Sequence, residues 1–146
     1  MTDTTNIWEN LDLSEDNSQT AYKLLIEQED NFAEKTNSEL LMVIESNVAA
    51  THNDPERRMY IYSLFVQVPS LGNFRKKILN VAEFLDVGRF PVTIYCDIDD
   101  THKENVKEED FLNVIKEILS RDSVKRVIEN LFRQSIEAKK MMTNKN

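Results

Sequence analysis

An alternating run of apolar residues constrains the fold of this chain more than any other feature. Within "MYIYSLFVQVP", residues 59–69, every second side chain is aromatic or aliphatic. A period of two places these side chains on one face of a β-strand, and Pro69 ends the run because proline cannot donate to a strand ladder. A strand needs partners, so we predict a β-sheet. The apolar face consists of Tyr60, Tyr62, Leu64, Val66 and Val68.

Residues 74–82 and 92–98 are the predicted neighbouring strands. Residues 74–86 are ambiguous, because their apolar residues also fit one face of a helix (Phe74, Ile78, Val81, Ala82 and Leu85). The short turn "SLGN" before them suits a hairpin, and an antiparallel meander connects the flanking strands economically. We therefore favour a strand for residues 74–82. Pro91 can begin the strand at residues 92–98. The prediction is a small, mainly antiparallel sheet of about three strands.

A pair of helices is predicted on each side of these strands. An N-terminal helix begins near Ser18, and "KTNS" interrupts it because Thr, Asn and Ser prefer caps and turns. Ser38 then caps a second helix, which ends at "HNDP". Two C-terminal helices follow, separated by "SRDS". The apolar positions behind these four helices are Tyr22, Leu25, Ile26, Phe32 and Ala33; Leu40, Leu41, Ile44 and Val48; Phe111, Val114, Ile115, Ile118 and Leu119; and Val124, Val127, Ile128, Leu131 and, continuing the last stripe, Ser135.

This order of elements predicts an α+β fold, because helices and strands are segregated along the chain. We expect a flexible acidic N-terminal segment at residues 1–17, a single domain at residues 18–140, and a frayed C-terminus at residues 141–146. The N-terminal segment contains one apolar cluster: Ile7, Trp8, Leu11 and Leu13. That cluster either docks on another protein, with Trp8 as its anchor, or folds back onto its own domain; we favour the second alternative.

Cysteine content and hydropathy indicate a cytoplasmic protein. Cys96 is the only cysteine, so no internal disulfide can form, and a reducing compartment is expected. Within its strand, Cys96 is expected to be a small core residue. No apolar run approaches the roughly 20 residues of a membrane span. The first residues, "MTDTTNIWEN", lack the pattern of a signal peptide. We therefore predict no membrane association.

Charge and glycine content exclude two classes of ligand. The net charge is −8, and residues 1–56 contain 13 acidic and 2 basic residues, whereas residues 121–146 contain 3 acidic and 7 basic residues. The acidic N-terminal part is a poor surface for nucleic-acid phosphates, and the asymmetry favours association within the chain or with a basic partner. Gly72 and Gly88 are the only glycines. Phosphate-binding loops need several, so Walker and dinucleotide-binding loops are excluded.

An acidic cluster follows the last predicted strand, in "TIYCDIDDT". This string resembles the first motif of haloacid dehalogenase-type phosphatases, an apolar strand followed by Asp-x-Asp-x-Thr. The resemblance implies that Asp97 is a nucleophile, Asp99 a general acid/base, and magnesium a cofactor. It covers nine residues, and the rest of the chain departs from the family: about 90 residues precede the motif, His102 replaces an apolar residue, and no strand is predicted downstream.

Two simpler interpretations of this cluster remain. Asp97, Asp99, Asp100 and His102 could together chelate a divalent cation, or they form a polar loop that leaves a strand and bonds its own backbone. We favour the polar loop and predict no catalytic, cofactor-binding or metal-binding residue. The chain is then a non-enzymatic, acidic protein-binding module, comparable in composition to immunity proteins, antitoxins or secretion chaperones. Its partner has a basic surface, or the chain associates with itself. The alternatives are a metal-dependent phosphohydrolase that uses Asp97 and Asp99, and a structural subunit of a larger assembly.

Overall fold

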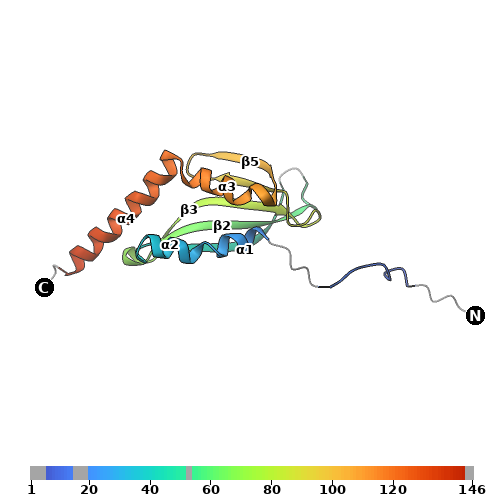
Figure 1. Ribbon diagram of the computed structural model, residues 1–146, viewed down its shortest axis with the longest axis horizontal. Coiled ribbons are helices and arrows are strands. Elements are labelled where there is room, and N and C mark those ends of the chain that lie inside the picture. The colour runs from blue at the N-terminus through green and yellow to red at the C-terminus, as the bar shows by residue number, and fades with distance from the viewer. Residues whose placement is uncertain (1–5, 15–19, 52–53, 144–146) are drawn as a thin grey trace, which may run out of the picture.

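A five-stranded antiparallel meander forms the centre of the fold (Figure 1). The computed structural model describes residues 6–14, 20–51 and 54–143. The strands follow one another in the sheet in chain order: β1 (Leu41–Ala50), β2 (Arg58–Val68), β3 (Phe74–Phe84), β4 (Val92–Cys96) and β5 (Thr101–Val106). The helices are α1 (Ala21–Ile26), α2 (Glu29–Lys35), α3 (Glu108–Leu119) and α4 (Asp122–Thr143), and a short 3-10 turn, η1 (Pro69–Leu71), lies between β2 and β3. The α+β class is therefore confirmed.

The register of the strands explains how the core forms. Tyr62 pairs with Val81 and Leu64 with Leu79, so the alternating apolar residues of β2 lie on the same face as those of β3. A β-bulge between Leu64 and Phe65 inserts Ile78 into this ladder, and both Ile78 and Leu79 are fully buried. The strands predicted at residues 60–68 and 74–82 are confirmed. The strand predicted at residues 92–98 is confirmed as β4, which ends at Cys96, a buried core residue.

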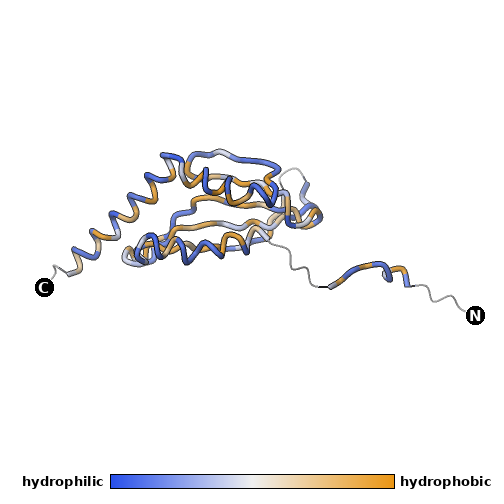
Figure 2. The backbone as a smooth tube through the Cα atoms, viewed as in Figure 1, coloured by the Kyte–Doolittle hydropathy of each residue, from blue (hydrophilic) through white to orange (hydrophobic). Residues whose placement is uncertain are grey.

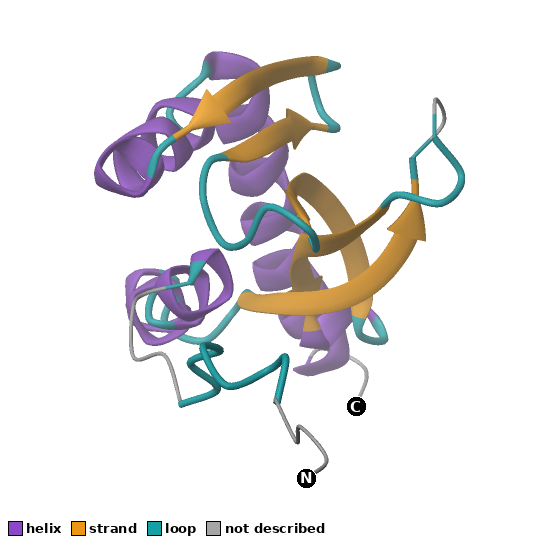
Figure 3. Cartoon of the chain, turned by 90° about the vertical axis from the view of Figure 1, so that its right-hand side faces the viewer, coloured by secondary structure: helices purple, strands orange, loops and turns teal. Residues whose placement is uncertain are grey.

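The helices cover one face of the sheet and one of its ends. Figures 1 and 3 place α1, α2 and α3 on the same face, where Leu25, Phe111 and Ile115 are buried against the strands. Helix α4 crosses the sheet near η1, where the hydroxyls of Ser70 and Ser135 are 2.7 Å apart. Hydrophobic and hydrophilic residues alternate along α3 and α4 in Figure 2, as expected for helices with one buried side. Both predicted C-terminal helices are confirmed.

The predicted second helix is wrong, because residues 41–50 form strand β1. Leu40, Leu41, Ile44 and Val48 fit helical spacing, but pairing with β2 along ten residues outweighs that local preference. Ser38 does not cap a helix. Asn37 and Ser38 instead adopt left-handed backbone conformations, with φ of 52° and 60°, and turn the chain into β1.

Two further predictions about the elements are wrong. The single helix expected before "KTNS" is divided into α1 and α2 at Glu27 and Gln28. The sheet has five strands instead of about three, because β1 and the polar edge strand β5 belong to it. The predicted domain start at residues 17–18 and the last three residues, 144–146, lie outside the described residues, whereas residues 141–143 end helix α4.

Candidate functional site

The acidic cluster is the tight turn between β4 and β5. The backbone N–H of Asp97 donates to Ile78 O at 2.9 Å, so Asp97 continues the ladder to β3. Asp100 adopts a left-handed conformation with φ of 56°, and Thr101 begins β5. The segment therefore returns directly into the sheet. The predicted polar loop that leaves the strand is wrong about its continuation, because the chain after Asp100 is strand β5.

The two aspartates of the motif face different partners. The carboxylate of Asp97 lies 3.7 Å from Lys77 Nζ and accepts from Asn80 Nδ2 at 3.4 Å, both on β3. The carboxylate of Asp99 accepts from Thr101 Oγ1 at 2.6 Å and from Arg121 Nη1 at 2.9 Å, at the junction of α3 and α4. Two carboxylates engaged by separate cations are not arranged to share one metal ion.

The carboxylate of Asp99 is already paired with a cationic side chain of the protein. The hydrogen bond from Thr101 and the charge of Arg121 lower the pKa of Asp99 to about 2. Arg121 also binds Glu117 at 3.1 Å, and these two carboxylates raise the pKa of its guanidinium. His102 packs against Tyr95, with ring centroids 5.8 Å apart. Within the described residues, no group of three or more His, Cys, Asp or Glu side chains is placed to hold a metal ion. The geometry gives the phosphohydrolase hypothesis no support.

An apolar groove lies on the helix-covered face of the sheet. It is a cavity of about 440 Å³ between α1–α2 on one side and α3 on the other, with Met42 of β1 and Leu64 of β2 at its floor. This volume is within the range of small-molecule and side-chain pockets. We call it the α2–α3 groove. Its lining consists of Leu25, Gln28, Asn31, Phe32, Lys35, Met42, Leu64, Leu112, Asn113, Ile115, Lys116, Leu119 and Ser120.

The groove exists because the helices on its two sides are packed differently. Helix α3 buries Phe111, Ile115 and Ile118 against the sheet, which leaves Leu112 at the side of the helix and 40% exposed. Helix α2 has no fully buried residue, and Phe32 is half-buried at the groove. The groove lining contains two lysines and no acidic residue. The site can therefore receive an apolar segment, and its electrostatic preference is for acidic flanking residues.

A buried carboxyl group lies elsewhere under the helices and was not predicted. Glu83 on β3 is 7% exposed and accepts a hydrogen bond from the Tyr62 hydroxyl at 2.7 Å. Its second oxygen, Oε2, has no hydrogen-bond partner. Burial raises the pKa of Glu83 and outweighs the hydrogen bond from Tyr62. Tyr22 and Tyr60 pack on the Tyr62 ring at 5.6 and 6.0 Å, so this cluster fixes α1 on the sheet.

Of the predicted segment 1–17, the structure describes residues 6–14, which lie away from the sheet and are called the N-terminal segment from here on (Figure 1). Ile7 is 79%, Trp8 66% and Leu13 86% exposed. The segment does not cover a sheet edge here, so the predicted folding back onto the domain is not seen in this structure. Its apolar side chains and the α2–α3 groove are both open to solvent.

Comparison with known proteins supplies no relative. No protein-family model, no curated protein and no solved structure matches this chain. In the described part of the chain, no helix is long and apolar enough to cross a lipid bilayer. The class defined by the structure is thus an α+β domain whose antiparallel meander carries helices on one face, with an open apolar groove between them.

Proposed function

We propose that this chain is a non-enzymatic protein-binding module of the cytoplasm, and that its partner inserts an apolar segment into the α2–α3 groove. The observation that carries the proposal is the groove itself. Leu112 is 40% exposed beside an apolar floor formed by Met42 and Leu64. Covering an exposed apolar surface with another apolar surface lowers the free energy, because both surfaces are removed from water. Amphipathic helices commonly bind in grooves of this kind.

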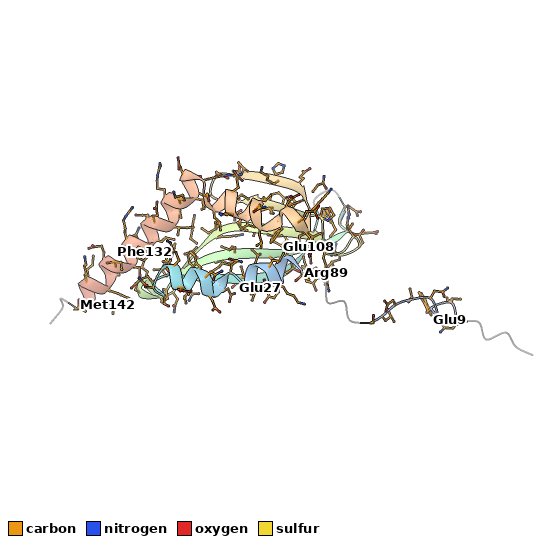
Figure 4. The ribbon with its side chains drawn as sticks, in the orientation of Figure 1. Glu9, Glu27, Arg89, Glu108, Phe132 and Met142 are labelled. Carbon is orange, nitrogen blue, oxygen red and sulfur yellow. The ribbon has the colours of Figure 1, made fainter. Side chains whose placement is uncertain are left out.

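We propose that the partner carries basic residues outside the segment that enters the groove, because the groove lining has two lysines whereas exposed acids lie on and between α1 and α2. Glu27, Asp30 and Glu34 are exposed on and between α1 and α2, and Figure 4 labels Glu27 there. Basic side chains of a partner would contact these acids while its apolar residues enter the groove. Long-range attraction of this kind speeds encounter more than it strengthens the final complex. Binding is therefore expected to weaken as ionic strength rises.

The experiment is a quantitative affinity capture from the cells that express the protein. We compare the wild type with Leu112→Lys, which places a cation in the groove wall, and with Leu85→Lys as the matched control. Leu85 is 47% exposed and lies outside the groove lining. The proposal expects a partner that the wild type and Leu85→Lys retain and that Leu112→Lys loses, with unchanged thermal melting for all three. Equal capture by all three variants would show that the groove is not the binding site.

Self-association through β1 is a second candidate, supported by the edge of the sheet. Strand β1 pairs only with β2 within the described residues, and Glu45 is its only charged residue. The opposite edge, β5, carries His102, Lys103 and Glu104. Charged residues protect an edge from pairing with another chain, and β1 lacks most of that protection. Val48→Lys should then convert a wild-type dimer into a monomer in sedimentation equilibrium; a wild-type monomer at every concentration contradicts this candidate.

A further inference from the structure

We infer that the N-terminal segment, residues 6–14, has a docked state in which its apolar side chains occupy the α2–α3 groove of the same chain. The inference goes beyond the proposed function, because docking requires the groove and the segment but no partner. A docked segment would also compete with any partner for the groove. Three independent features of the two surfaces support it: apolar complementarity, charge complementarity and reach.

Three apolar residues of the segment, Ile7, Trp8 and Leu11, belong to a hydrogen-bonded turn. Asn6 begins this turn, since its Oδ1 accepts from the Trp8 N–H at 3.0 Å. The Leu11 N–H donates to Trp8 O at 3.1 Å, which closes the turn. Ile7, Trp8 and Leu11 are spaced i, i+1 and i+4, so they can share one face if the turn extends into a helix. Because the turn is already formed, docking would lose less conformational entropy than it would with a fully extended chain.

The charges of the two surfaces are opposite. The groove lining contains Lys35 and Lys116 and no acidic residue. The segment contains Glu9 and Asp12 and no basic residue. Both lysines are exposed, so their amines remain hydrated at the rim while apolar residues fill the floor. An acidic apolar segment therefore suits this groove, whereas basic residues of a partner would gain an advantage only at the exposed acids on and between α1 and α2.

The chain is long enough for docking within one molecule. Six residues separate Ser14 from Ala21, the first residue of α1. Their full extension spans up to about 25 Å. Leu25, the first residue of the groove lining, lies one helical turn from Ala21, roughly 6 Å along α1. Docking would place Ser14 near Leu25 and Asn6 toward Lys35, antiparallel to α1 and α2.

Trp8 is the only tryptophan of the chain, so its fluorescence tests the inference directly. Acrylamide quenching and the emission maximum are measured for the full chain and for a synthetic peptide of residues 1–17, in which Trp8 is exposed. The variants are Leu112→Glu, which places an acid in the groove wall, and Leu85→Glu as the matched control outside the groove. We expect several-fold weaker quenching in the wild type and in Leu85→Glu than in the peptide, with emission at shorter wavelength. Leu112→Glu should return both readouts to the values of the peptide.

Two results would overturn the inference. The first is wild-type quenching equal to that of the peptide. The second is protection of Trp8 that disappears on dilution, which would assign the docked segment to a second copy of the chain. Circular dichroism melts of Leu112→Glu exclude unfolding as the cause of its exposure. The capture experiment with a chain lacking residues 1–17 tests the proposed function separately, because that chain keeps the groove and lacks Trp8.

Discussion

Replacing Asp97 and Asp99 one at a time distinguishes a structural turn from a catalytic pair. Asp99 and Arg121 are largely shielded, with side chains 20% and 22% exposed, and their charged hydrogen bond is 2.9 Å long. A shielded charged pair is intermediate between an exposed ion pair and a buried one, so Asp99→Asn should cost about 1–2 kcal/mol of unfolding free energy. Asp97 is 3.7 Å from an exposed Lys77. Asp97→Asn should therefore change stability by less than about 0.5 kcal/mol.

The assay is urea denaturation of the wild type and both variants across acidic pH. The pKa of Asp99 is lowered to about 2, below the roughly 3.9 of an unfolded aspartate. A lowered folded-state pKa contributes stability that is complete above the unfolded value and is lost as pH falls through the folded value. The difference between wild type and Asp99→Asn should therefore be constant above about pH 5 and shrink toward pH 2.

The same variants test function. If the turn is structural, Asp97→Asn should leave partner capture unchanged, and magnesium should change the melting temperature of wild type and variant equally little. Equal destabilisation by both replacements would show that the contacts of Asp97 have been underestimated. A phosphatase activity that is abolished in Asp97→Asn would refute the non-enzymatic proposal.

Three further predictions concern stability. Leu131→Ala should cost about 2–5 kcal/mol in urea melts, because Leu131 on α4 is 7% exposed; a change below about 0.5 kcal/mol would mean that α4 is loosely packed. Glu83→Gln should stabilise the fold increasingly as pH rises. The raised pKa of Glu83 means that its stabilising contribution is complete at low pH and is lost as pH rises through the folded-state value; a difference that does not vary with pH contradicts this. Deleting residues 1–17 should lower the melting temperature by no more than about 4 °C, the effect of a weak docked contact; a much larger drop would make Trp8 a core residue.

The elements predicted correctly are those whose own residues show the periodic pattern of apolar side chains that is typical of a strand or a helix. Strand β2 alternates because one of its faces is buried from Tyr62 to Val68, and α3 shows an apolar stripe because it packs on the sheet. Strand β1 lacks such a signal, since residues 45–48 are exposed on both faces of an edge strand. Its apolar residues were therefore assigned to a helix by chance spacing. Strand β5 is exposed except at Val106, so nothing in its sequence distinguishes it from a loop.

Only one part of the candidate site, the apolar cluster near the N-terminus, could be predicted from the sequence. The apolar cluster of the N-terminal segment, with Trp8, is an obvious feature of an otherwise polar stretch. The groove could not be predicted from the sequence, because it depends on the distance between α2 and α3, and no local sequence pattern encodes that distance. Leu112 falls outside the apolar stripe of α3, and that position at the side of the helix is the reason it lies on the groove wall.

Some acids of the N-terminal part of the chain form ion pairs within the fold, and others remain exposed to solvent. The exposed acids are the ones that a partner could contact. The amine of Lys139 on α4 lies 2.6 Å from a carboxylate oxygen of Glu39, and the other oxygen accepts a hydrogen bond from Ser135. An acid of the N-terminal part and a base of the C-terminal part thus hold α4 against the rest of the fold. Glu45 is likewise paired with Arg75. The exposed acids on and between α1 and α2 are placed differently, since they belong neither to the groove lining nor to the core. Charges that neither pack nor pair cost a fold little and can steer a partner of opposite sign. Part of the charge asymmetry therefore acts within the chain at α4, and the proposed basic partner would meet the remaining acids at α1 and α2.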